Sequence, residues 1–191
     1  PDVTPSDITG FTMPSLQTGE MEYKSGAVMS QIVLADEINR TSPKTQSSLL
    51  EVMEERQVTV DGQTYDLPTP FVVLATQNPT GSAGTTLLPS SQLDRFLIRL
   101  SMGYPDHKSQ INILRDRHSE NPLDRVQPVV TKDELLELVR ETRNVEANDR
   151  IFDYVTTLAE ATRTHPMVEL GVSPRGALFL DRMAKAHAYL D

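Results

Sequence analysis

The feature that most constrains the fold is an apolar segment that runs directly into two adjacent carboxylates. Residues 32–40 read IVLADEINR, so four apolar residues immediately precede Asp36 and Glu37. Such a short continuous apolar run is typical of a strand in a parallel sheet, with both faces covered. Because unpaired charges are costly to bury, we expect the strand to end at a polar site. The pattern predicts an α/β fold.

Three further side chains are predicted near a strand end or a helix start. The segment FVVLATQNP, residues 71–79, predicts a second buried strand followed by Asn78. Arg95, in the segment LDRF, precedes a predicted third strand over residues 97–100, and Arg175 lies in the first turn of a predicted final helix. Active sites of α/β sheets lie at the carboxyl ends of strands, and helix N-termini attract anions. These residues are therefore candidates for one site.

Each candidate also has a simpler interpretation. Asp36 and Glu37 are equally well explained as strand-end carboxylates that face water. Asn78 precedes a proline, and Asn favours turns. Arg95 in a pair with a surface acid would contribute little to stability, and Arg175 would simply be solvated. Taken one at a time, none of these residues decides between the two interpretations.

Local signals divide the chain into an α/β part, residues 1–103, and an all-helical part, residues 104–191. Asp61-Gly62, between two alternating segments, predicts a hairpin, and the turn at Thr18-Gly19 predicts another. N-cap residues followed by proline or by a capping-box glutamate open several of the predicted helices. The helices are expected at about residues 43–56, 90–96, 106–118, 131–139, 148–163 and 174–191.

Composition limits the possible classes of function. The net charge of −9 argues against broad nucleic-acid binding, which needs clustered Lys and Arg. The absence of cysteine excludes disulfides, cysteine-ligated zinc and thiol catalysis. No apolar run approaches the length of a membrane span. We therefore expect a cytoplasmic protein with no nucleic-acid partner and no membrane span.

Four segments together identify a family. DEINR, ATQNP, LDRF and SPRG occur in this order, with a helix and the DG hairpin between the first two. With them the chain resembles the MoxR family of AAA+ ATPases over nearly its whole length, from PSDITG at residues 5–10 to SPRGAL at residues 173–178. The resemblance implies a partial AAA+ P-loop NTPase core of parallel strands, helices and inserted hairpins, followed by an all-α lid domain.

The resemblance also implies a role for each candidate residue. Asp36 matches the Walker B aspartate, which helps to hold Mg²⁺, and Glu37 matches the catalytic glutamate, which polarises the attacking water. Asn78 matches sensor 1, which helps to orient that water and senses the γ-phosphate. Arg95 matches the arginine finger, which acts on the ATP of a neighbouring subunit. Arg175 matches sensor 2, which reaches the phosphates from the lid.

For the whole protein, the resemblance implies an ATPase that binds ATP and Mg²⁺ and couples hydrolysis to chaperone-like remodelling of partner proteins. Such proteins usually assemble into a hexameric ring, and they often pair with von Willebrand factor A-type proteins. The hairpin within residues 11–30 corresponds to the helix-2 insert of the family. The hairpin at Asp61-Gly62 corresponds to the one before sensor 1.

The chain departs from the family pattern at the phosphate-binding loop. The pattern G-x-x-x-x-G-K-[ST], whose backbone N–H groups and lysine cradle phosphates, does not occur in the sequence. We therefore expect a fragment that lacks this loop, binds ATP weakly or not at all, and is inactive alone. Loss of the strand that feeds the loop also predicts exposed sheet edges, which tend to pair with another chain.

Two other interpretations of the whole chain stay open at this point. One is a non-catalytic protein-binding or scaffold module derived from the AAA+ fold. The other is a helicase-type or chelatase-type relative, since those proteins also carry the helix-2 insert. The net charge of −9 and the close match of DEINR and SPRG weigh against the second of these.

Overall fold

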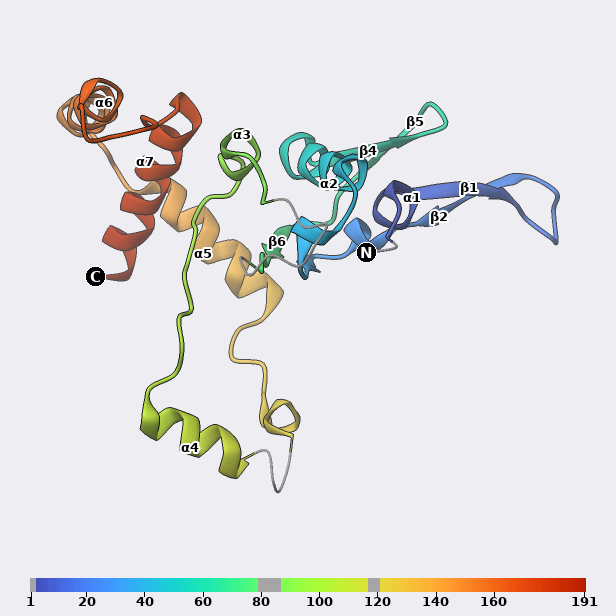
Figure 1. Ribbon diagram of the computed structural model, residues 1–191. Helices are drawn as coiled ribbons and strands as arrows, with labels where there is room; N and C mark the ends of the chain where they lie inside the picture. The colour runs from blue at the N-terminus through green and yellow to red at the C-terminus, as the bar shows by residue number, and fades with distance from the viewer. Residues whose placement is uncertain (1–2, 79–86, 117–120) are drawn as a thin grey trace. The chain divides into compact units, whose positions relative to one another are not determined.

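A computed structural model describes residues 3–78, 87–116 and 121–191 of the chain (Figure 1). The chain forms two compact units, Pro1–Phe96 and Leu97–Asp191. Over its described residues, the first unit mixes short strands with helices, whereas the second contains helices and connecting segments. Each unit is described by itself.

The first unit has a helical turn at each end of a series of short strands. Its described elements are α1 (Pro5–Thr9), β1 (Gly10–Pro14), β2 (Met21–Ser25), the 3₁₀ turn η1 (Ala27–Met29), β3 (Ile32–Ala35), the 3₁₀ turn η2 (Ile38–Arg40), α2 (Pro43–Glu55), β4 (Gln57–Val60), β5 (Gln63–Asp66), β6 (Val72–Ala75) and α3 (Ser90–Leu93). Within the described residues the strands form three two-stranded sheets, of which β1–β2 and β4–β5 are antiparallel and β3–β6 is parallel.

The parallel pair β3–β6 carries the two apolar segments predicted as strands. The register pairs Ile32 with Val72 and Ala35 with Ala75. One face of the pair packs against the core, whereas Ile32 and Leu34 on the other face are both 66% exposed. The prediction that β3 is covered on both faces is therefore wrong for one face. Val33, Ala35, Val73 and Ala75 on the inner face pack against the core, and within the described residues this sheet consists of β3 and β6.

The core of the first unit is aliphatic and is centred on α2. Leu49, Leu50 and Val52 of this helix are buried together with Val28 of η1 and Ile38 of η2. Ser42 caps the helix by accepting a hydrogen bond from the Thr45 N–H at 3.1 Å, and Pro43 follows in the first turn. The predicted helix at residues 43–56 is confirmed, because cap and apolar face both lie where the sequence places them.

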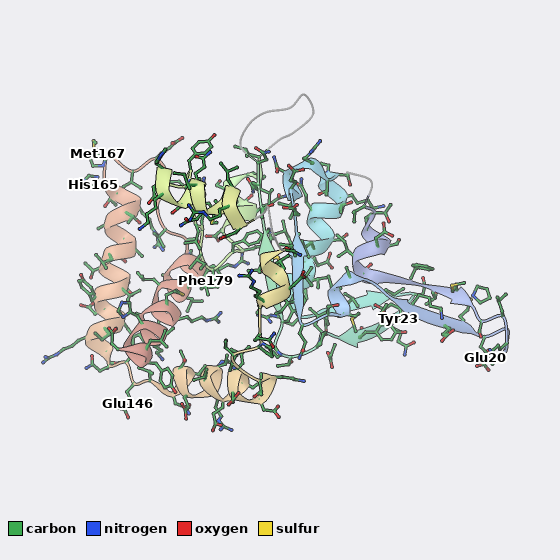
Figure 2. The ribbon with its side chains drawn as sticks, turned by 90° about the horizontal axis from the view of Figure 1, so that it is seen from below. Glu20, Tyr23, Glu146, His165, Met167 and Phe179 are labelled. Atoms are coloured by element: carbon green, nitrogen blue, oxygen red, sulfur yellow. The ribbon has the colours of Figure 1, made fainter. Side chains whose placement is uncertain are left out.

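The two hairpins of the first unit contact each other, because β1–β2 side chains meet both a strand residue and the turn of the β4–β5 hairpin. Asp61 and Gly62 both have positive φ, at 49° and 81°, as a tight two-residue turn requires. The rings of Tyr23 and Tyr65 stack with centroids 4.0 Å apart, and Thr12 donates a hydrogen bond to Asp61. Figure 2 shows Tyr23 on the β1–β2 hairpin, with Glu20 at the far end. Both predicted hairpins are confirmed.

The second unit consists of helices joined by extended segments. Its described elements are α4 (His107–Asp116), the 3₁₀ turn η3 (Pro122–Arg125), α5 (Lys132–Asn144), α6 (Asp149–Thr164) and α7 (Pro174–Leu190). The capping box predicted at Thr131 and Glu134 is present, because each side chain bonds the backbone N–H of the other. Helix α7 packs against α5 and α6. The predicted end of the first of these helices, at His118, lies outside the described residues.

Residues 97–100 do not form the predicted third strand. The structure has a bend at Leu97 and no regular secondary structure at residues 98–100. Leu97, Ile98 and Leu100 are exposed at 46%, 54% and 78%. A strand needs a neighbour to satisfy its backbone groups, and the parallel sheet within the described residues contains only β3 and β6. An apolar segment alone does not provide that neighbour.

Hydrophobicity along the helices is limited. Among residues 3–78, 87–116 and 121–191, no helix combines the length and the apolar character that a membrane crossing needs.

We expect Leu50→Ala to lower the free energy of unfolding of the chain by about 2–5 kcal/mol, because it leaves a cavity at a side chain in the core. Leu50 is 2% exposed, whereas Leu16 in the β1–β2 loop is fully exposed. Leu16→Ala deletes the same atoms and is the matched control, with an expected change within about 0.5 kcal/mol. Urea unfolding measures both, and equal effects would contradict the assigned core.

Candidate functional site

The parallel register of β3 and β6 brings two polar strand ends together. Ala35 and Ala75 are the last paired residues, so Asp36 and Thr76 follow them side by side. The ladder continues past the strands, because the Thr76 N–H donates to the Ala35 carbonyl at 3.0 Å and the Ile38 N–H donates to the Thr76 carbonyl at 3.0 Å. The carboxyl ends of the two strands therefore form one continuous hydrogen-bonded edge.

Thr76 fixes both members of the carboxylate pair. Its hydroxyl donates to Asp36 Oδ1 at 2.6 Å and accepts from the Glu37 N–H at 2.8 Å. A hydroxyl can do both at once, since it has one donor and two lone pairs. Glu37 has a left-handed backbone, with φ 49° and ψ 46°. Such a conformation costs about 1–2 kcal/mol for a residue with a Cβ, and residues held this way concentrate at functional sites.

The side chain of Glu37 lies between two donors. Arg40 Nη1 is 2.7 Å from Glu37 Oε2, and Asn78 Nδ2 is 3.5 Å from Glu37 Oε1. The hydrogen bond from Arg40, followed by that from Asn78, holds the pKa of Glu37 below its ordinary value. Glu37 is therefore an ionised acceptor at neutral pH. The structure brings Asp36, Glu37 and Asn78 together as one cluster.

Asn39 connects the backbone of Asn78 to the same turn. Its side-chain Nδ2 donates to the Asn78 carbonyl at 3.1 Å, and its Oδ1 accepts from the Asn78 N–H at 3.2 Å. The turn itself is fixed to α2, because Gln46 Nε2 donates to the carbonyls of Ile38 and Thr41, each at 3.1 Å. Asn39, Gln46 and Ile38 are all buried. Buried hydrogen bonds thus connect the polar edge to the core of the first unit.

Arg95 lies in the first unit but bonds elsewhere. Its Nε is 3.0 Å from Glu54 Oε2 of α2, and its Nη1 donates to the Ser91 carbonyl at 3.4 Å. It lines a pocket of about 430 Å³ together with Glu51, Glu54 and Glu55. Three carboxylates repel a phosphate, so this pocket does not suit an anion. The geometry does not join Arg95 to the cluster of Asp36 and Glu37.

Arg175 belongs to the second unit. It follows the N-cap Ser173, whose hydroxyl accepts from the Gly176 N–H at 2.9 Å, and it lies in the first turn of α7. The predicted helix start is therefore confirmed. The functional role of Arg175 stays a prediction.

Three residues of the site escaped the sequence-based prediction: Thr76, Asn39 and Arg40. Asn39 and Arg40 lie in IVLADEINR and Thr76 lies in FVVLATQNP. The role of each depends on a partner that only folding brings close. Thr76 is the easiest of the three to predict from the sequence, since parallel pairing of IVLA with FVVLA puts it beside Asp36. Asn39 could have been found as an uncharged polar residue between Ile38 and Arg40, at a position that proves to be buried.

The cluster suits a hydrated magnesium ion better than a metal held by protein ligands alone. Mg²⁺ typically keeps several waters and takes one or two carboxylates together with substrate phosphates. Asp36 is exposed, and one of its oxygens is oriented by Thr76. No group of three or more acidic, histidine or cysteine side chains among the described residues is arranged to hold a metal. Asp36 is thus a fitting single ligand for a metal that arrives with a phosphate.

Comparison with known proteins shows which family has this architecture. A family model described as "ATPase family associated with various cellular activities (AAA)" matches residues 1–98, and one described as "AAA lid domain" matches residues 160–191. The chain belongs to the AAA+ ATPases, within the MoxR family. The predicted fold class, a partial AAA+ core followed by a helical lid region, is confirmed.

Individual relatives agree with this assignment. YeaC of Bacillus subtilis is 50% identical over 190 residues, which cover 100% of this chain and 59% of YeaC. Chaperone MoxR1 of Mycobacterium tuberculosis is 35% identical over 197 residues, which cover 98% of this chain and 52% of MoxR1. A crystal structure from Cytophaga hutchinsonii superposes with a TM-score of 0.86 at 39% identity, covering 99% of this chain and 60% of that one. The chain thus spans between half and two thirds of the length of these relatives.

We expect Arg40→Gln to raise the pKa of Glu37 toward its ordinary value, because the hydrogen bond from Arg40 is the main cause of the lowered pKa. In the unchanged protein the contact stabilises the fold at neutral pH, and its contribution is lost as the pH falls through the lowered pKa. An NMR titration of the Glu37 carboxyl measures the shift. Lys24→Gln, which removes the ion pair of Lys24 with Glu22, is the control. An unchanged pKa of Glu37 in Arg40→Gln would contradict the assigned contact.

Proposed function

We propose that this chain is part of an ATPase that couples Mg-ATP hydrolysis to chaperone-like remodelling of partner proteins. The observation that carries the proposal is the cluster of Asp36, Glu37 and Asn78, joined by hydrogen bonds at the carboxyl ends of two parallel strands. Ligands of open α/β sheets bind at this end of the strands. Membership of the AAA+ ATPases supports ATP as the ligand.

The residues of the cluster divide the chemistry among them. Phosphoryl transfer depends mostly on positioning and on stabilising spread negative charge. Asp36 would hold Mg²⁺, which when bound neutralises charge on the phosphates. Glu37, ionised at neutral pH, would accept a hydrogen bond from the attacking water and orient it. Asn78, whose Nδ2 is 3.5 Å from Glu37 Oε1, would share that water with Glu37 and contact the γ-phosphate.

The chain needs additional residues to hold the phosphates. The sequence contains no G-x-x-x-x-G-K-[ST] pattern, and the relatives extend well beyond the matched region. We propose that the phosphate-binding loop belongs to a longer protein of which this chain is a piece. Alone, the chain would bind ATP weakly or not at all and would be inactive. Arg175 would complete the site as sensor 2, from a lid that we place at residues 104–191.

Arg95 would complete the site of a neighbouring subunit. The pocket that it lines is acidic and disfavours the binding of a phosphate there. An arginine supplied by a neighbour instead makes activity depend on assembly. We propose a ring, a hexamer, in which Arg95 exchanges its contact with Glu54 for the nucleotide of the next subunit.

The partners are proposed from the family alone. One relative is named a chaperone, which supports remodelling of other proteins as the output of hydrolysis. We propose von Willebrand factor A-type proteins as partners, an action in the cytoplasm, and no role for nucleic acid, in keeping with the net charge of −9. The exposed β1–β2 hairpin, as the helix-2 insert, is a natural place for coupling to such partners.

We expect Glu37→Gln to lower kcat for ATP hydrolysis by the full-length protein about 10²–10⁴-fold, because the amide cannot act as the base that orients water. Binding of ATP should persist. Glu20→Gln, at an exposed position of the β1–β2 loop, makes the same chemical change and should leave basal hydrolysis unaltered. An unmutated protein that forms rings but does not hydrolyse ATP would contradict the proposal and favour a non-catalytic binding module.

We expect Arg95→Ala to lower kcat of the full-length protein about 10³–10⁵-fold, as for arginine fingers supplied in trans. Mixing it with Glu37→Gln should restore activity, since an equimolar ring pairs an intact Glu37 with an intact Arg95 at about a quarter of its head-to-tail interfaces. Each variant mixed with itself is the control. A mixture that stays inactive while mixed rings form would show that Arg95 does not act across the interface.

A further inference from the structure

We propose that Asn39 is a positioning residue that sets the place of Asn78 relative to Glu37. This inference rests on the proposed ATPase function and concerns the same site. Asn39 is 2% exposed, and its amide is directed at the backbone of Asn78 rather than at solvent. Buried polar groups need partners, and this one is satisfied by the very residue that contacts Glu37.

The geometry is that of one further rung on the parallel ladder. The Asn39 side chain donates to the carbonyl and accepts from the N–H of a single residue, Asn78, at 3.1 and 3.2 Å. A side-chain amide has the same donor and acceptor as a peptide group. The backbone bond from Ile38 to the Thr76 carbonyl is therefore followed by a side-chain clamp two residues further along. The orientation of the Asn39 amide is fixed because each backbone partner can only donate or only accept.

The clamp links Asn78 to the core of the unit. Asn39 sits in η2 beside Ile38, which is buried, and the Ile38 carbonyl accepts from Gln46 of α2 at 3.1 Å. A displacement of the Asn78 backbone would have to break both bonds of the clamp or move this turn. Hydrogen bonds to the core thus extend past the end of β6 to Asn78, the residue at which sensor 1 is predicted.

The position of Asn78 matters for catalysis because its hydrogen bond to Glu37 is long. Asn78 Nδ2 is 3.5 Å from Glu37 Oε1, at the outer limit of a hydrogen bond. Small backbone shifts therefore decide whether Asn78 shares a water with Glu37 or loses contact with it. Misplacement of a catalytic group by about 1 Å can cost about 10²-fold in rate. Asn39 and Glu37 lie in one turn, so the two hydrogen bonds from Asn39 fix the position of Asn78 relative to Glu37.

A purely structural role makes a different prediction, and Thr45 provides the comparison. Thr45 is 1% exposed, and its hydroxyl donates to the Val3 carbonyl at 2.9 Å, so it too is a buried polar side chain bonded to distant backbone. The hydrogen bonds of its side chain go to Val3 and Ser42 and not to Glu37 or Asn78. Loss of its hydroxyl should cost stability alone.

The test measures kcat, KM for ATP, melting temperature and ring assembly in the full-length protein with Asn39→Ala, Asn39→Asp and Thr45→Val. We expect Asn39→Ala to lower kcat about 10–100-fold, because a catalytic group misplaced by about 1 Å can cost about 10²-fold in rate. KM for ATP should change by no more than about twofold, because the clamp contributes to the transition state rather than to uniform binding. Asn39→Asp keeps the size and the acceptor but sets a carboxylate against the Asn78 carbonyl, so its kcat should fall as well.

The control decides between positioning and stability. Thr45→Val should lower the melting temperature and leave kcat unchanged at a temperature where the protein is folded. Unchanged kcat in a folded Asn39→Ala or Asn39→Asp protein, with hydrolysis still abolished by Glu37→Gln, would overturn the inference and leave the proposed function intact. Absence of hydrolysis in the unmutated ring would overturn both. If neither Asn39 variant folds, the side chain is a stability residue and the inference fails.

Discussion

The parallel pairing of β3 with β6 is the interaction on which the rest of the site depends. The two strands are short, yet their register places Asp36 beside Thr76 and brings Asn78 to the turn that follows β3. A shift of one residue would send every side chain to the opposite face. The chemistry proposed for the cluster therefore depends on a backbone register, which the inward-facing residues of both strands, Val33, Ala35, Val73 and Ala75, hold against the core.

The site gains rigidity from the helix that follows it. Helix α2 begins at Pro43 directly after the polar turn, buries one face in the core, and returns a side chain, Gln46, to the carbonyls of that turn. Packing energy in the core is thereby linked to the placement of Glu37, which keeps a left-handed backbone. A residue held in such a conformation persists only where surrounding contacts over-determine it.

The local elements could be predicted from the sequence, and the contacts between distant segments could not. The Asp61-Gly62 hairpin and the helices opened by Ser42 and Thr131 depend on neighbours within a few residues, so their signals are complete in the sequence. The strand expected at residues 97–100 failed because it needs a partner strand. The role of Thr76 depends on Asp36, which lies 40 residues away in the chain. No local sequence pattern predicts this contact.

A crystal structure of the full-length protein with Mg²⁺ and a non-hydrolysable ATP analogue tests the proposed site most directly. We expect the metal beside the carboxylate of Asp36, with the γ-phosphate and its facing water next to Glu37 and Asn78 at the ends of β3 and β6. A nucleotide bound elsewhere, with these three side chains far from any phosphate, would contradict it.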